Sequence, residues 1–112
     1  MFAGVIPRRD ISVATLNSSG AGTGRIQNNN AAVLWVLFQV SVVSSPNQSS
    51  GNCQCRLTPP TGVIDTSYFA GTGDTAPGVY FLYPMDFIDH TWSGGPASGR
   101  GIVTYQYLEV PL

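Results

Sequence analysis

The stretch AAVLWVLFQVSVV, residues 31–43, is the one long and nearly unbroken apolar run in the chain. Five of its residues are valine, and it also holds the aromatic residues Trp35 and Phe38. Valine and aromatic residues favour a β-strand over a helix. Its 13 residues, fully extended, would span roughly 40 Å, which is longer than a usual strand. The run therefore predicts a strand that contains a bulge or a break.

The two faces of this strand are expected to differ along its length. From residue 36 onward the side chains alternate between an apolar face and a more polar one, which is typical of a half-buried strand. This pattern predicts a core face made of Val36, Phe38, Val40 and Val42. The first half is apolar on both faces, so we expect Leu34 and Trp35 to be covered on both sides. They are placed either centrally in the fold or where another subunit packs, and are candidate interface residues.

Length and composition indicate one domain of the all-β class. A chain of 112 residues is large enough to bury about 65% of its unfolded surface around a single core. With 13 Gly, 8 Pro and only 10% charged residues, it is rich in turn formers and poor in residues that build surface helices. We predict a single antiparallel β-sandwich, jelly-roll or immunoglobulin-like, with about seven or eight strands over residues 1–112. Residues 1–10 are expected to form an extended N-terminal arm.

Turn-forming residues separate the other predicted strands. These strands cover residues 11–16, 52–58, 63–69, 79–83, 87–92 and 102–110. Residues 21–27 and 70–78 are interpreted as connecting segments, because they are rich in small residues or in Gly, Asp and Pro. Asp74 could belong to a cation site, but the spacing of a calcium loop is absent, which favours a surface turn.

Alternation within the last two strands predicts further core and interface residues. Ile88, His90 and Trp92 share one face, and Ile88 and Trp92 are expected in the core. In the final strand Tyr105 and Tyr107 share a face with Val103. Tyrosine suits surfaces with one apolar and one wet side, so both tyrosines are predicted interface residues.

Cys53 and Cys55 are expected to be reduced, and at least one of them is expected to be buried. A Cys-x-Cys pair without a second pair or a nearby histidine is a weak zinc motif. Residues two apart on a strand are also poorly placed for a disulfide. The two thiols are therefore interpreted as small core hydrophobes, and no metal or cofactor is predicted.

The chain lacks a recognisable catalytic motif. It has one histidine, His90, and no GxSxG, HExxH, P-loop or GxGxxG sequence. Strand alternation would turn Asp89 away from His90, so the pair is not expected to act as a base and its orienting carboxylate. His90 is interpreted as a partly buried structural residue beside Trp92, and the protein is not expected to be an enzyme.

Charge and hydropathy exclude other classes of function. The chain has no lysine, and Arg8, Arg9, Arg25, Arg56 and Arg100 are scattered, so nucleic-acid binding is not expected. No run approaches the ~20 apolar residues of a membrane span, and no secretory signal is recognised, so we expect synthesis in a cytoplasm. The formal net charge of −1 gives little protection against self-association, which suits a protein inside an assembly.

The second half of the chain resembles a known family. Its motifs are VIDTSYFAGTGDTA at 63–76, an aromatic strand, DFIDHTWSGG at 86–95, a Gly-rich loop and TYQYLEV at 104–110. This order is similar to that of small β-sandwich structural proteins in virions of tailed bacteriophages, especially those infecting actinobacteria, of the capsid decoration or minor tail type. The resemblance implies a sandwich without catalytic residues, located in the virion after synthesis in the host cytoplasm.

Two functions therefore stay open. The first is a non-enzymatic virion subunit that assembles through apolar and main-chain contacts with copies of itself and with other virion proteins, such as major capsid or tail subunits. The alternative is a carbohydrate-binding module in which exposed tyrosines stack on sugar rings. Its candidate residues are Tyr80, Tyr83, Tyr105 and Tyr107.

Overall fold

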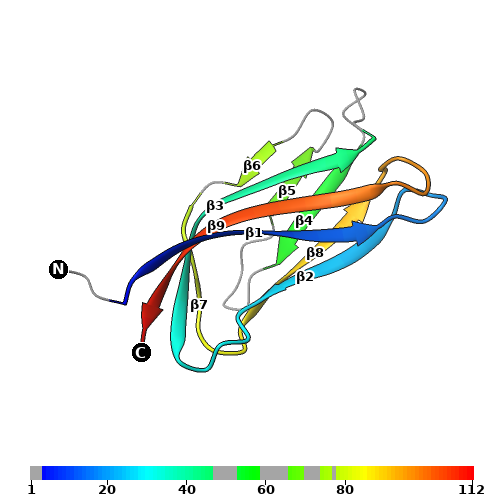
Figure 1. The fold of residues 1–112 in the computed structure, drawn as a ribbon. Coiled ribbons are helices and arrows are strands. Elements are labelled where there is room, and N and C mark those ends of the chain that lie inside the picture. The colour runs from blue at the N-terminus through cyan, green and yellow to red at the C-terminus, as the bar shows by residue number, and fades with distance from the viewer. Residues whose placement is uncertain (1–3, 47–52, 59–65, 70–73, 77) are drawn as a thin grey trace.

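Two antiparallel sheets pack face to face in the computed structural model, which describes residues 4–46, 53–58, 66–69, 74–76 and 78–112 (Figure 1). Within these residues the chain forms nine strands and no helix, so the predicted antiparallel β-sandwich is confirmed. The strands are β1 (Ile6–Thr15), β2 (Gly22–Gln27), β3 (Val33–Ser45), β4 (Gln54–Thr58), β5 (Thr66–Phe69), β6 (Asp74–Ala76), β7 (Tyr80–Leu82), β8 (Phe87–Ser93) and β9 (Arg100–Pro111).

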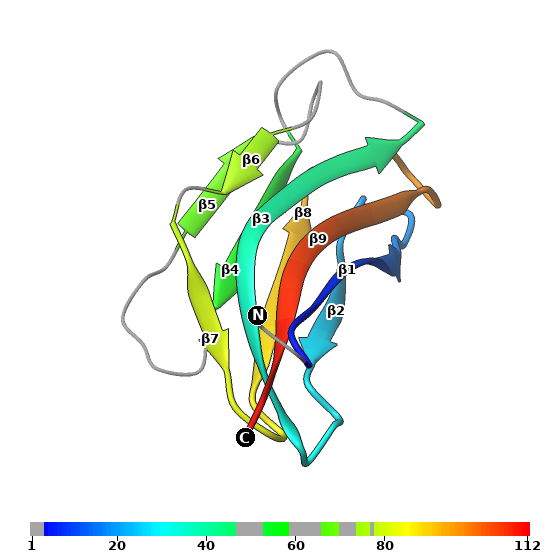
Figure 2. The ribbon, with the colours of Figure 1, turned by 60° about the vertical axis from the view of Figure 1, so that its left-hand side comes forward.

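The order of the strands identifies the type of sandwich. The five-stranded sheet has the order β1-β9-β3-β6, and β7 also pairs with β3; the four-stranded sheet has the order β2-β8-β4-β5. When the three-residue strand β7 is set aside, the remaining eight strands follow the order of a jelly roll, with two sheets of four. Of the two sandwich types predicted from sequence, the structure therefore has the jelly roll. Figure 2 shows its long strands β3 and β9 bending together along their length.

The central strand β3 contains a bulge, one of the two irregularities predicted for it. Its pairing with β9 shifts register between Leu37 and Gln39, so Phe38 is the extra residue. Before the bulge Trp35 and Leu37 face the core, whereas after it Val40 and Val42 do. An uninterrupted alternation would have put Val36 and Phe38 on the same side as Val40.

This change of face corrects two core predictions. Phe38 is 44% exposed, so its predicted place in the core is wrong, and Val36 is only partly buried. The other predicted core residues, Val40, Val42, Ile88 and Trp92, are buried as expected. The physical reason is that one inserted residue reverses which side chains point inward, because side chains on a strand alternate with a period of two.

Two strand glycines make room for two buried rings. A Cβ atom at Gly24 of β2 would collide with the His90 ring, and one at Gly101 of β9 would collide with the Trp92 ring. The small residues in 21–27, interpreted from sequence as a flexible connection, therefore belong to a strand that packs closely over a ring.

Other segment boundaries also differ from the predictions. β1 begins at Ile6, so residues 6–10 of the expected arm are extended and pair with β9. β6 occupies residues 74–76 of the expected turn and pairs with β3. Of the strand predicted at 63–69, residues 66–69 form β5, and residues 63–65 lie outside the described part of the chain. Pairing partners distant in sequence decide these boundaries, which local composition does not encode.

Candidate functional site

The outer face of the five-stranded sheet is the main candidate for a functional surface. Its side chains form rows because neighbouring strands pair residue by residue. At one end a row runs from β1 to β7 through Pro7, Leu108, Val36 and Phe81. Leu34 of β3 pairs with Val110 of β9 beyond this row. These residues are exposed or only partly buried, so this end of the sheet presents apolar side chains to the surroundings.

The middle of the same face is mostly polar, apart from the exposed Ile11, and its far end is apolar again. The middle rows contain Arg9, Gln106 and Gln39, and then Ile11, Thr104, Ser41 and Thr75. At the far end Val13, Ile102 and Val43 form another apolar row across β1, β9 and β3. We call this whole surface, from the Leu34 row to the Val13 row, the apolar face.

Several of the most exposed large apolar residues lie in β7 and in the turn that follows it. Phe81 and Tyr83 are each 54% exposed, and Met85 is 59% exposed. Met85 sits in a turn closed by a 2.9 Å hydrogen bond from the Asp86 amide to the Tyr83 carbonyl, with φ of 71°. A left-handed backbone costs a non-glycine residue about 1 to 2 kcal/mol. The turn thus exposes the Met85 side chain to water in a backbone conformation that glycine adopts at a lower free-energy cost.

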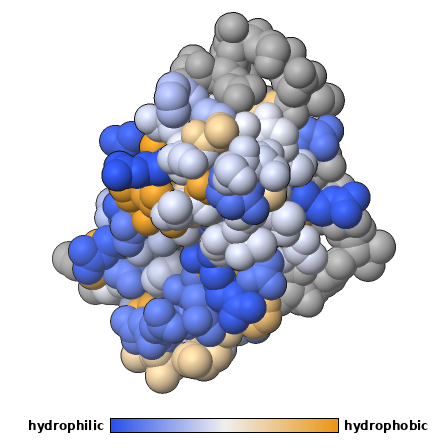
Figure 3. All heavy atoms as spheres, turned by 90° about the vertical axis from the view of Figure 1, so that its right-hand side faces the viewer, coloured by the Kyte–Doolittle hydropathy of each residue, from blue (hydrophilic) through white to orange (hydrophobic). Residues whose placement is uncertain are grey.

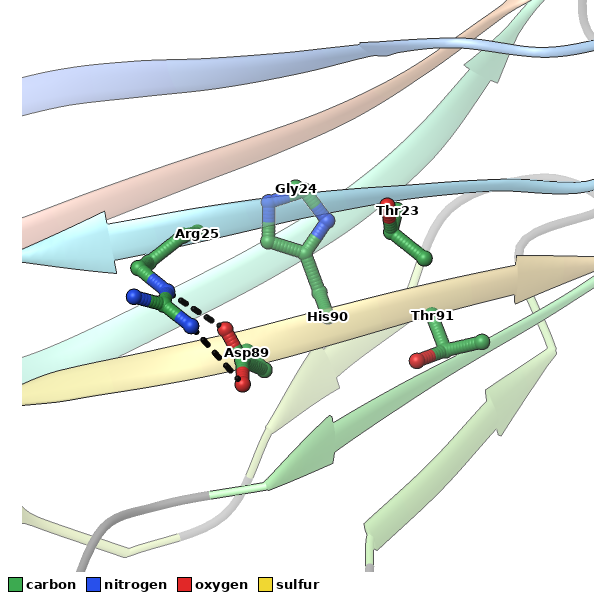
Figure 4. Close-up of a pocket in the computed structure, with 6 residues that line it drawn as sticks. All are labelled: Thr23, Gly24, Arg25, Asp89, His90 and Thr91. Carbon is green, nitrogen blue, oxygen red and sulfur yellow. Dashed lines mark hydrogen bonds and ion pairs between the residues drawn. The ribbon is translucent and has the colours of Figure 1, made fainter.

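The outer face of the four-stranded sheet is polar by contrast. On β2 and β8 it presents Thr23, Arg25, Asp89 and Thr91 around an open depression of about 420 Å³ (Figure 4). Arg25 Nε donates to Asp89 Oδ1 at 2.7 Å, and its guanidinium lies 3.8 Å from the centre of the Phe87 ring. This ion pair is about half exposed, so it contributes little to stability and offers no enclosed site.

At one end of the sandwich the surface carries both hydrophobic and hydrophilic residues. Figure 3 looks at the end of the molecule towards which β1 and β3 run. Hydrophobic residues gather on the left of this view beside hydrophilic ones, while pale and hydrophilic residues cover its middle.

His90 anchors a polar network between the two sheets. Trp92 Nε1 donates to His90 Nδ1 at 3.0 Å, so Nδ1 is the acceptor and the neutral ring carries its proton on Nε2. His90 Nε2 then donates to Ser12 Oγ of β1 at 3.0 Å, and Ser12 Oγ donates to the Arg25 carbonyl of β2 at 3.2 Å. The network therefore joins β8 to both β1 and β2, and Figure 4 shows the His90 ring lying over Gly24.

The contact between Ser12 and His90 is not a catalytic pair. Burial lowers the pKa of His90 to about 4, although the Asp89 carboxylate acts in the opposite direction. A general base would need a free lone pair on Nε2, but the hydrogen bond from Trp92 fixes the proton there. His90 is also completely buried, so the structural role predicted for it fits the geometry.

Three of the four predicted interface residues lie in the core of the chain. Trp35, Tyr105 and Tyr107 are 8%, 6% and 5% exposed, and the Trp35 ring stacks on Tyr107 with centroids 4.2 Å apart. Burial, with smaller contributions from Asp10 and Tyr107, raises the pKa of Tyr105 to about 12. Leu34 is partly exposed on the apolar face. Trp35 lies on the inward face of β3 before the bulge, and Tyr105 and Tyr107 lie on the inward face of β9, so these rings fill the sandwich and do not face a partner.

The same burial affects the sugar-binding alternative. Stacking on a sugar needs an accessible ring face, which Tyr105 and Tyr107 lack. Tyr83 is exposed, and Tyr80 is partly buried against the core. The sequence did not predict that Phe38, Ile11 and Val13 are exposed. The length of the central strand predicted an irregularity, but not that it would lie at Phe38.

Neither a metal centre nor a reactive thiol emerges from the described residues. Cys53 and Cys55 are free and buried, as predicted, and burial raises the pKa of Cys55 to about 12. Among the residues that the structure describes, no group of three or more His, Cys, Asp and Glu side chains could hold a metal ion. No helix in that part of the chain is long and apolar enough to cross a membrane.

Comparison with known proteins adds a similarity of fold. No family model and no curated protein matches the sequence. Among solved structures, the chain is similar to one from the "Acidic stable capsid structure of Helicobacter pylori bacteriophage KHP30". The TM-score is 0.51 at 8% identity, over 92% of this chain and 93% of that chain. The whole jelly roll, and not one part of it, is therefore similar to a chain found in a phage capsid structure.

Proposed function

We propose that this protein is a non-enzymatic structural subunit of a tailed-phage virion, either a capsid decoration or minor capsid protein or a tail component. The observation that carries the proposal is the similarity of fold, over nearly the full length of both chains, to a chain of a phage capsid structure. Jelly rolls are frequent in viral capsids, although one fold serves many functions. The proposed location is the virion, with synthesis in the host cytoplasm.

The surface of the chain supports assembly through apolar contacts. The apolar face exposes large hydrophobic side chains over several strands, which monomeric soluble proteins rarely do. The ion pairs Arg8–Glu109 and Arg25–Asp89 are internal to the chain and take up four of its eleven charged side chains. The expected partners are copies of the chain itself and other virion proteins, such as major capsid or tail subunits.

The proposal is tested on particles. An antibody against the purified chain, detected with gold in the electron microscope, should label intact virions at regular positions. Proteomics of the same particles, purified by density gradient, should detect the chain in a fixed ratio to the major capsid protein. Absence of the chain from purified particles would defeat the proposal, and glycan-array binding would then favour the carbohydrate-binding module.

A further inference from the structure

We propose that the apolar face is the contact between two copies of this chain, packed face to face about a twofold axis. This inference rests on the proposed function, because it names the surface through which the subunit pairs within the particle. The face lies on the outer side of β1, β9, β3 and β7, away from the core of the sandwich.

The bulge in β3 adds to this face an aromatic side chain that could have been buried. Phe38 is the extra residue at the shift between Leu37 and Gln39, and its side chain is 44% exposed. Bulges re-aim side chains and are found where function needs it. Phe81 lies on the neighbouring strand β7, where it pairs with Val36, and its side chain is also exposed. Phe38, inserted next to the row of Gln39 and Gln106, is therefore the expected anchor near the centre of the contact, and Phe81 is the expected anchor in its end row, since buried aromatic anchors dominate interfaces.

The pattern on the face suits a second copy of the same chain. A twofold interface must be complementary to itself. Apolar rows lie at both ends, around Leu108 and around Ile102, and a polar strip containing Gln106 lies between them. A twofold axis in the plane of the face that runs along this strip, or crosses it parallel to the strands, places apolar rows on apolar rows and polar side chains on polar ones.

The size and charge of the face agree with such a pair. With the Leu34 row included, the face runs along β9 from Ile102 to Val110, which is about 30 Å, and four neighbouring strands make it roughly 20 Å wide. The resulting area, roughly 600 Å² on each copy, reaches the lower end of the range that one partner contributes to a stable interface. The charged residues among the described side chains of the face are Arg9 on the edge strand and Arg100 at one end of β9, so its centre carries no charge that pairing would bury.

The test compares charged substitutions on the two outer faces. Light scattering and sedimentation of the whole chain should show a dimer that persists at high salt, which screens charges but not apolar contacts. Phe38→Asp and Phe81→Asp should each raise the dimer dissociation constant by roughly 30-fold or more. The matched control is Thr91→Asp, at an exposed position on the outer face of the four-stranded sheet, and it should leave the dimer intact. Circular dichroism of each variant checks that it is folded.

A label reports the geometry directly. A spin label on Gln106→Cys, in the middle of the apolar face, should give a short distance between the two copies, whereas the same label on Thr91→Cys should not. The native thiols are buried and should not compete for the label.

The outcomes separate this inference from the proposed function. Dimers that are unchanged by both Phe substitutions would overturn the apolar face as the contact. A chain that stays monomeric, but whose Phe81→Asp variant no longer binds particles, would assign the face to another virion protein and overturn the pairing of copies. In either case, presence of the chain in purified virions would leave the proposed function standing.

Discussion

The two sheets of the sandwich share one core but present different outer faces. The outer side of β2 and β8 carries threonines and the Arg25–Asp89 ion pair, and its large apolar residue among those described, Phe87, lies under the Arg25 guanidinium. The outer side of β1, β9, β3 and β7 exposes Ile11, Val13 and Phe81 without such cover. One sheet is therefore adapted to solvent, while the other keeps the apolar character of a strand that is covered on both sides.

The difference shows that burial in the core and apolar character are separate properties in this chain. The same strand, β3, buries Trp35 and exposes Phe38 three residues later. Substitutions at the two kinds of site should therefore differ strongly in their effect on the free energy of unfolding, even though both remove an aromatic ring.

The largest effect is expected for Trp92→Ala. Trp92 is buried between the sheets against Gly101 and donates to His90, so its truncation should lower the free energy of unfolding by about 3 to 5 kcal/mol. Phe38→Ala, on the apolar face, should cost under about 1 kcal/mol in the monomer. Denaturant unfolding at low protein concentration measures both. Equal costs would mean that Phe38 is packed within the chain and would remove the contrast between inner and outer sites.

A pH-dependent effect of roughly 3 kcal/mol is expected from His90. Its pKa is about 4 in the folded chain and 6.5 in the unfolded chain, so the unfolded state binds more protons between these values. The stabilisation is complete above pH 6.5 and is lost as the pH falls towards 4. Protonation would also place a hydrogen on Nδ1, facing the Trp92 N–H.

The control for this prediction is His90→Gln, which cannot titrate. Unfolding free energies of both proteins, measured at intervals from pH 7.5 to pH 4, should diverge in slope below pH 6.5. Parallel curves would show that carboxylates alone cause the acid sensitivity.

The smallest effect is expected on the solvent-adapted face. The Arg25–Asp89 pair is about half exposed, so a double-mutant cycle with Arg25→Ala and Asp89→Ala should give a coupling energy under about 1 kcal/mol. Added salt should reduce this coupling further, because solvent ions screen exposed charges. A coupling of several kcal/mol would indicate that a partner covers this face too, and the two sheets would then no longer differ.

Much of the fold could be predicted from residue pattern alone. The β-branched run at 31–43 predicted a strand with a bulge or a break, and the structure has the bulge. Alternation placed Ile88 and Trp92 in the core, and strand geometry left Cys53 and Cys55 unbridged. The candidate surface was harder to predict. The sequence indicated that residues near Leu34 are apolar on both faces, but it assigned Trp35 and the tyrosines of the last strand to the wrong side.

What the sequence by itself determined is the all-β class, the single sandwich and the central place of β3, because these depend on local propensity and period. The tertiary structure alone decided the jelly-roll order and the position of the bulge at Phe38. It also decided that Gly24 and Gly101 lie directly against buried rings, where no larger residue would fit. Each depends on which distant strand lies alongside. A shift of one residue in that pairing turns every following side chain from the core to the surface, and nothing local in the sequence marks where the shift occurs.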